Sequence, residues 1–227
     1  MSVDLSLAVA QDIGFVSSDK PCSRDAQLND GWTCFRAQGD QYHGTPTGSR
    51  LPAGAALGPT RLLLGLELPF DAIDSKGESA GVLPARWPIV IGARFGWAFR
   101  GIAPPSDGQE HAFPVGGELT ARVKLTASSS FRLDLLAVTG VRLLDAYAKI
   151  KVTEDRSVPP SVYQLDNPDK QTLDGYKRMG TGFVGAGLAA TFTLAKWSAL
   201  RFELPVSVFF PSSGVAVTPA MALVVTP

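Results

Sequence analysis

The chain has few histidines, few cysteines and no surplus of either charge. Its 227 residues include two His and two Cys, and 21 basic side chains balance 21 acidic ones. A balanced charge argues against nucleic-acid binding, which requires a basic face or stripe. No apolar run approaches the roughly 18 residues that a membrane-spanning helix needs. The composition therefore excludes a nucleic-acid-binding protein and a helical membrane protein.

The pattern of a catalytic or metal site is also missing. The two imidazoles, His43 and His111, lie far apart in the sequence, and the cysteines lack a CxxC spacing. No Gly-rich run leads into a helix as a phosphate-binding loop does. One acidic loop lacks the spacing of an EF-hand and is expected to be solvated: Asp166, Asp169 and Asp174. We therefore predict that the protein is not an enzyme and has no catalytic residue, cofactor or metal ion.

Apolar and polar residues alternate with a period of two along most of the chain. In WPIVIGARFGWAFRG, apolar side chains such as Ile89, Ile91 and Phe95 form one face, and small or polar residues form the other. Such stretches predict eight long strands, at residues 2–15, 55–71, 87–101, 113–127, 131–152, 179–195, 198–210 and 214–226. Interior glycines suit the curvature of a narrow barrel. The predicted fold class is all-β, a closed antiparallel up-and-down β-barrel of about eight transmembrane strands, in one domain over residues 1–227.

The connections between these strands alternate in length. The sequences SSS and KW make short turns, whereas long loops are predicted near 16–54, 101–112 and 153–178. The gap at 72–86 is longer than this alternation requires. An even number of strands with short turns at one end is typical of an up-and-down barrel.

Three positions are expected to be irregular. A two-serine turn in the last hairpin would pair Phe210 with Val215, which places apolar opposite apolar. Pro205 and Pro219 lie inside predicted strands, and a bulge at one level of this hairpin would absorb both. Polar residues change parity after Leu143–Leu144, which predicts a β-bulge there.

Both cysteines lie in one polar loop, PCSRDAQLNDGWTCF. Cys22 and Cys34 leave three interpretations open: a disulfide, a metal site that would need further ligands, and two free thiols. A disulfide is favoured because a polar, Gly-containing loop is a poor place to bury free thiols, and it implies an oxidising compartment. It would stabilise the small loop by roughly 3 kcal/mol. We predict a Cys22–Cys34 bond that presents Trp32 and Phe35 as a surface for contact.

The composition of the polar face indicates whether the apolar face of the barrel is turned inward or outward. A soluble carrier barrel turns its apolar face inward around a ligand, whereas a membrane barrel turns it outward to lipid. The polar face is rich in Gly, Ala, Ser and Thr, which suits a narrow, filled lumen in which opposite charges pair. The charges expected in this lumen are Arg61, Glu67, Arg94, Glu118, Arg122, Lys124, Arg201 and Glu203. On a soluble protein they would be a solvated face, so a soluble lipocalin-like barrel that binds a small apolar ligand stays open as the alternative.

Aromatic residues gather near both ends of the predicted strands, as they do at the two interfaces of a bilayer. The short-turn end has Phe70, Trp87, Phe131 and Trp197. The long-loop end has Phe15, Trp97, Phe99, Phe113, Phe209 and Phe210. In a soluble barrel the same residues would belong to the core.

The arrangement resembles the small outer-membrane β-barrels of Gram-negative bacteria, the eight-stranded class of OmpA, OmpX and OmpW. The stretches GARFGWAFRG and FFPSSGVAVTPAMALVV look like the third strand and the closing hairpin of such barrels. The resemblance covers almost the whole chain and rests on pattern more than on a specific motif. It implies that the termini and short turns are periplasmic and that the long loops are extracellular.

The resemblance also implies a location in the bacterial outer membrane and a non-enzymatic role. The expected role is a structural anchor that displays surface loops for adhesion or for docking in an envelope complex. Outer-membrane lipid and other envelope proteins are the expected partners, and nucleic acid is not. The opening MSVDLSLAVAQD lacks the basic start and apolar core of a secretory signal, so the sequence is expected to be a mature chain. Because side chains nearly fill an eight-stranded barrel, we expect a plugged lumen.

Overall fold

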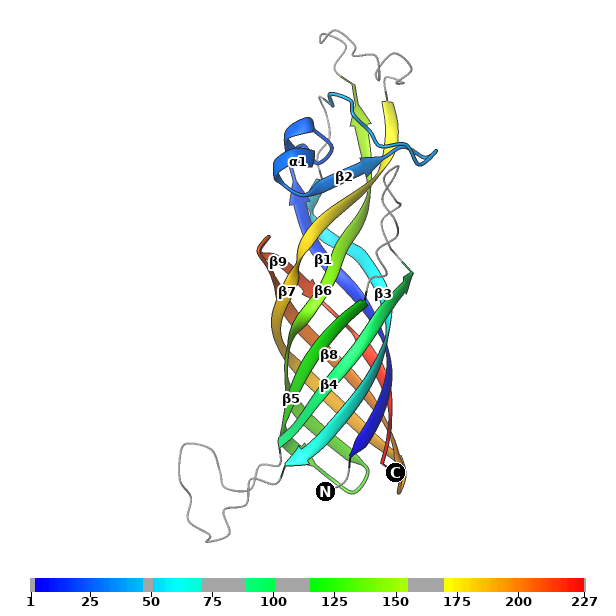
Figure 1. Ribbon diagram of the computed structural model, residues 1–227, viewed down its shortest axis with the longest axis vertical. Coiled ribbons are helices and arrows are strands. Elements are labelled where there is room, and N and C mark those ends of the chain that lie inside the picture. Colours follow the sequence, from blue (N-terminus) through cyan, green and yellow to red (C-terminus); the bar gives the residue numbers. More distant parts are fainter. Residues whose placement is uncertain (1–2, 47–50, 71–88, 101–114, 155–169, 227) are drawn as a thin grey trace.

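The computed structural model is a closed antiparallel β-barrel with a small cap above one end (Figure 1). It describes residues 3–46, 51–70, 89–100, 115–154 and 170–226. The elements are β1 (Asp4–Ser18), α1 (Arg24–Asn29), β2 (Trp32–Phe35), β3 (Leu51–Phe70), β4 (Ile89–Arg100), β5 (Val115–Ala127), β6 (Phe131–Thr153), β7 (Lys170–Ala195), β8 (Ser198–Phe210), β9 (Gly214–Val217) and β10 (Ala220–Val225). In the part of the chain described, no helix is long and apolar enough to cross a membrane.

The hydrogen bonds of the sheet run around eight strands, if β9 and β10 are taken as one interrupted strand. β1 pairs with β3 on one side and with β9 and β10 on the other, which closes the ring. Both ends of the chain lie at the end of the barrel away from the cap (Figure 1). The predicted all-β, antiparallel barrel is confirmed.

The alternation along the strands places apolar side chains outside and charged side chains inside. On β1, Leu5, Leu7 and Val9 are each more than two-fifths exposed, whereas Arg201 and Glu203 of β8 are 0% and 4% exposed. A carrier for an apolar ligand has the opposite arrangement, with its apolar face turned inward. The alternative prediction of a lipocalin-like interior is therefore wrong for this barrel.

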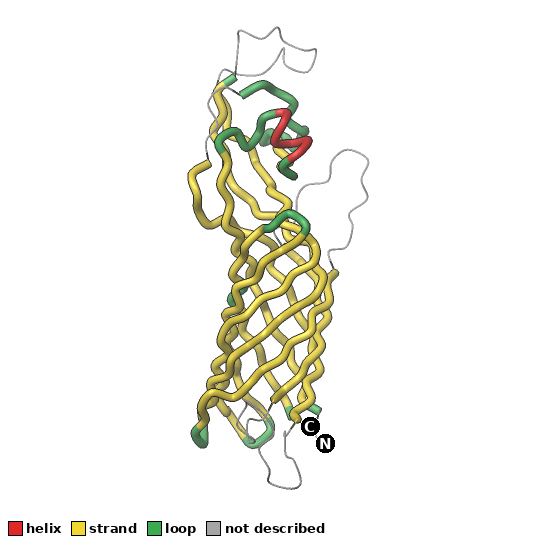
Figure 2. Tube along the Cα trace, turned by 90° about the vertical axis from the view of Figure 1, so that its left-hand side faces the viewer, coloured by secondary structure: helices red, strands yellow, loops and turns green. Residues whose placement is uncertain are grey.

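β6 and β7 rise beyond the rest of the barrel and carry the cap (Figures 1 and 2). β7 begins at Lys170 rather than at residue 179, so residues 170–178 of the loop predicted at 153–178 are strand, and residues 155–169 lie outside the described residues. The loop predicted at 16–54 contains α1 and β2. Beyond the upper ends of β4 and β5, β3 meets β6 directly, with Leu57 opposite Tyr147. Residues 71–88 and 101–114 lie outside the described residues, so the predictions for those connections stay predictions.

The bulge predicted in β6 is confirmed, because the β6–β7 register shifts between Val141 and Asp145. The predicted register of the last hairpin is wrong by two residues: Val208, not Phe210, pairs with Val215. A shift of two keeps every side chain on its face, which is why the alternation gave the correct faces with the wrong turn. The register differs because the turn between β8 and β9 is longer than the two serines that the prediction assumed.

Both strand prolines meet at one interruption, as predicted. The strand breaks between β9 and β10 at Thr218–Pro219, and the Thr218 N–H donates to the Pro205 carbonyl at 3.0 Å. Next to this break, the β1–β3 register shifts between Gln11 and Ile13, because β3 bulges and two of its residues, Gly58 and Pro59, lie opposite Asp12. The Gln11 amide donates to the carbonyls of Asp12 and Gly58, each at 2.8 Å, and so satisfies backbone groups that the bulge would leave unpaired. Because the extra residue is in β3, β1 keeps its alternation, and Asp12 is fully buried in the lumen.

Candidate functional site

Seven of the eight predicted lumen charges belong to one connected set of buried ion pairs, which Asp12 and Arg142 complete. At its centre, Glu67 accepts two hydrogen bonds from Arg201, at 2.8 and 2.5 Å, and pairs with Arg122. Arg94 donates to both carboxylate oxygens of Glu203, at 2.6 and 2.5 Å. Such bidentate contacts are the strongest form of arginine–carboxylate pairing. The carboxylates neutralise most of the positive charge that the strands bring inside.

Two residues that the prediction did not include connect the rest of this set. Asp12 pairs with Arg61 and Arg142 and accepts a hydrogen bond from the Thr218 hydroxyl at 2.8 Å. Arg142 also lies 3.4 Å from Glu118, which in turn lies 3.3 Å from Arg94. Asp12 of β1 therefore links three parts of the wall: the neighbouring β3 through Arg61, the distant β6 through Arg142, and the break between β9 and β10 through Thr218. The period-two sequence of β1 does contain the signal, because Ser6, Ala8, Ala10 and Asp12 share one parity.

The eighth predicted charge, Lys124, stands apart from this set. It is half-buried near the short-turn end and forms no ion pair with the described residues. At the same end, Arg132 donates to Asp134 at 2.6 Å as a separate pair. Lys124 is placed too near the end of β5 to reach the central carboxylates.

The upper lumen is closed by aromatic and aliphatic side chains. The Arg142 guanidinium lies 4.1 Å from the ring centroid of Phe183 and 5.2 Å from that of Phe209, and the two rings stack at 5.4 Å. Above them an apolar cluster includes Val16, Leu144 and Met179. The predicted place of Phe209 in an outer girdle is wrong, since it is 0% exposed. Its parity with Arg201 and Glu203 turns it inward.

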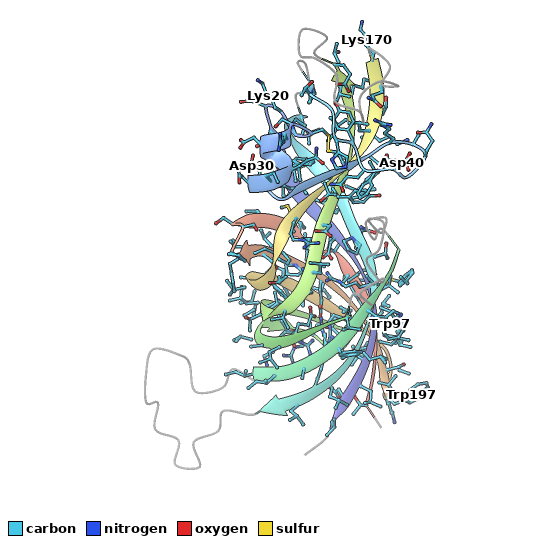
Figure 3. All side chains as sticks on the ribbon, turned by 45° about the horizontal axis from the view of Figure 1, so that its top comes forward. Lys20, Asp30, Asp40, Trp97, Lys170 and Trp197 are labelled. Carbon is cyan, nitrogen blue, oxygen red and sulfur yellow. A yellow bond between two sulfur atoms is a disulfide. The ribbon has the colours of Figure 1, made fainter. Side chains whose placement is uncertain are left out.

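Other predicted girdle residues are on the outer surface. Phe15, Phe99 and Phe210 are about half-exposed at the long-loop end, and Trp197 is 62% exposed at the short-turn end (Figure 3). Trp97 and Phe131 are half-buried. The remaining three side chains lie outside the described set: Phe70, Trp87 and Phe113.

The cysteine loop folds into a cap on the extended strands. β2 pairs with β7, placing Cys34 opposite Gly175, and a Cys22–Cys34 disulfide with a Cα–Cα distance of 5.8 Å joins β2 to the segment before α1. Ser23 begins the helix by accepting a hydrogen bond from the Ala26 N–H at 3.2 Å. The cap is thus held by a strand pairing, a helix cap and a covalent bond.

Trp32 and Phe35 are not presented to a partner, so the predicted contact surface is wrong. Each is only 2% exposed. Trp32 belongs to a cap core with both cysteines and Tyr42, built on β6 and β7 by Ile150, Val152 and Leu173. Phe35 packs edge-on against Tyr176, with centroids 5.9 Å apart. The prediction assumed that no core exists beyond the barrel, whereas the extension of β6 and β7 supplies one.

A half-buried carboxylate joins the cap to the top of β6. Glu154 accepts hydrogen bonds from the Tyr42 hydroxyl at 2.5 Å, from the Thr45 N–H at 3.2 Å and from the Gln171 amide at 3.1 Å. Burial and this carboxylate raise the pKa of the Tyr42 phenol, so it stays protonated and donates. On the helix side, Lys177 lies over the Trp32 ring at 5.9 Å, and burial lowers the pKa of its ammonium.

No group of three potential metal ligands comes together among the described residues. His43 is exposed in the cap. Asp174 accepts a hydrogen bond from the Tyr147 hydroxyl at 2.7 Å. His111, Asp166 and Asp169 lie outside the described residues.

Comparisons with known proteins give a likeness of fold. No protein-family model and no curated protein matches the chain. Among solved structures, the crystal structure of Neisserial surface protein A matches this chain with a TM-score of 0.38 and 7% sequence identity. The alignment covers 99% of this chain and 97% of the chain of that protein.

Proposed function

We propose that the chain is a non-enzymatic outer-membrane β-barrel that anchors and displays its disulfide-bonded cap. The observation that carries this proposal is the inverted distribution of side chains, with apolar residues on the outer wall and buried ion pairs inside. A contiguous apolar surface of this kind marks contact with a membrane or with another protein. A barrel is one of the two structures that can span a bilayer, because all its backbone groups pair internally.

The height of the apolar wall agrees with a bilayer. Exposed apolar residues of β1 run from Leu5 to Phe15. Ten residues of strand span about 33 Å, or about 25 Å along the axis of a barrel tilted by about 40°. An apolar band of about 25 Å is typical of transmembrane barrels. The cap would then stand outside the membrane, on the side where β6 and β7 project.

The membrane location is tested by how the protein behaves without lipid. We expect the purified chain to need detergent, and to migrate differently on a gel before and after heating, because the closed barrel resists unheated detergent. Both properties follow from an apolar outer wall around a fully paired sheet. A monodisperse, detergent-free solution of the folded chain would contradict the proposal.

The filled lumen supports an anchoring role rather than a channel. Arg142 and the stacked Phe183 and Phe209 lie across the upper lumen, above the ion pairs. We expect planar bilayers that contain the protein to show no steady conductance, while a porin in the same bilayers conducts. Steady current steps that scale with the amount of inserted protein would contradict the plugged lumen.

A further inference from the structure

The outward face of the β6–β7 extension carries a row of basic residues. Lys149 and Lys151 alternate with Ile150 and Val152, which are 2% exposed in the cap core, so the two lysines point away from the cap. Lys170 of β7 lies opposite Thr153. All three lysines are exposed. We call these three residues the basic face; Figure 3 labels Lys170 at the top of β7.

The basic face begins at the upper edge of the apolar wall. Leu57, which is 60% exposed, is paired with Tyr147, and Phe15, which is 49% exposed, lies opposite Ala55, slightly higher still. Tyr147 and its neighbour Tyr176, with ring centroids 5.3 Å apart, therefore lie near the top of the apolar wall, just below the level of Phe15. Tyrosine is enriched at that level of a membrane. Lys149 and Lys151 follow about 7 and 13 Å further along the strand.

The acidic residues on this face are already engaged. Asp145 accepts from Arg178 at 3.2 and 3.4 Å, and Asp174 accepts from the Tyr147 hydroxyl. The three lysines have no hydrogen-bond or ion-pair partner among the described residues. Asp174 lies opposite Lys149 and keeps its negative charge, because the Tyr147 hydroxyl that it accepts from is neutral. Its charge offsets one of the three lysines, so the face keeps a net positive charge for an external anion.

We propose that the basic face binds the headgroup of a phosphorylated glycolipid in the outer leaflet around the barrel. The inference rests on the proposed membrane location. Charge complementarity selects an anionic headgroup, and the position at the edge of the apolar wall selects one attached to lipid. The lysines lie about 7 to 20 Å along the strand from the level of Tyr147, which fits a headgroup with phosphates at more than one depth. The Tyr147 and Tyr176 rings below them offer flat surfaces for its sugars.

The test compares lysine pairs at the two ends of the barrel. Wild type, Lys149→Gln/Lys151→Gln and the control Lys124→Gln/Lys196→Gln are prepared in uncharged detergent micelles, and their affinities for fluorescent lipopolysaccharide are measured. Each lysine near an anionic surface is worth about fivefold in affinity. We expect the Lys149/Lys151 pair to bind at least tenfold more weakly at low salt, the control pair to bind like wild type, and the difference to shrink at high salt.

Several outcomes would overturn this inference. Equal affinity of wild type and the Lys149/Lys151 variant would do so, as would undiminished binding of dephosphorylated glycolipid. Displacement of the glycolipid by excess inorganic phosphate would indicate a site for a free anion. If the two lysines only prevent strand pairing at the open edge of β6, the variant will self-associate and bind lipid normally, which also overturns it.

Failure of the membrane proposal itself is recognised separately. All three proteins should float with vesicles of neutral phosphatidylcholine, since the apolar wall is unchanged. Absence of flotation in all three would overturn the membrane location and this inference with it. Flotation of all three with unchanged glycolipid affinity would overturn this inference alone.

Discussion

Glu67→Gln is expected to lower the free energy of unfolding by about 3–5 kcal/mol, the cost of removing one partner from a buried ion pair. Glu67 is 0% exposed, accepts from Arg201 through both oxygens and is the ion-pair partner of Arg122. The substitution preserves size and removes the charge, so buried guanidinium groups lose their compensation. Urea titration of the protein in vesicles, followed by tryptophan fluorescence and gel mobility, measures the loss.

A second substitution distinguishes this electrostatic cost from a general loss of packing. Glu67→Gln/Arg122→Gln removes the surplus positive charge together with the carboxylate, so the double variant should recover part of the lost stability. The exposed Asp25→Asn in the cap is the control and should cost less than about 1 kcal/mol. A Glu67→Gln barrel as stable as wild type would show that the lumen ion pairs are not needed for stability.

Trp32→Ala is expected to unfold the cap and leave the barrel closed. Trp32 is 2% exposed and contacts the disulfide and the β6–β7 extension, and truncation of such a residue costs about 3–5 kcal/mol. A cap of this size has too small a core to absorb that loss. Limited proteolysis should therefore cut the variant within residues 19–46, while its heat-dependent gel mobility stays that of wild type.

The matched control for this prediction is Leu28→Ala on α1. Leu28 is 72% exposed, so its truncation removes few contacts and should leave the cap resistant to protease. Equal resistance of Trp32→Ala and wild type would contradict the buried cap core. Loss of the barrel mobility in Trp32→Ala would contradict the separation between cap and barrel.

The barrel could be predicted because the alternation of apolar and polar side chains is a local feature of the sequence. Side chains alternate at every second residue, and that parity assigns Arg94, Glu203 and most other lumen charges to the inner face whatever the exact register. The register of a hairpin depends on the length of its turn. The predicted pairing of Phe210 with Val215 was therefore wrong, although the predicted inner and outer faces of the two strands were correct. The prediction that Lys124 joins the lumen ion pairs was wrong for another reason. Parity gives the face on which a residue lies, but not its distance along the barrel axis from possible partners.

The cap was not predictable from the same pattern. Residues 170–178 contain one large aliphatic side chain, Leu173, so their alternation is too weak to indicate a strand. They become a strand because β6 pairs with them on one side and β2 on the other. The burial of Trp32 follows from these pairings, which join segments far apart in sequence. A local pattern cannot contain such information.

The spacing of the two cysteines has a consequence for the order in which the protein assembles. The disulfide joins residues 12 apart, so it closes a short loop and requires no distant part of the chain. The pairing of β2 with β7 instead requires a strand from the second half of the chain, and contacts of that separation form slowly. If the barrel inserts into a membrane as proposed, a chain oxidised before insertion would arrive with this loop already closed, and the paired β6 and β7 strands would then bind a preformed cap segment.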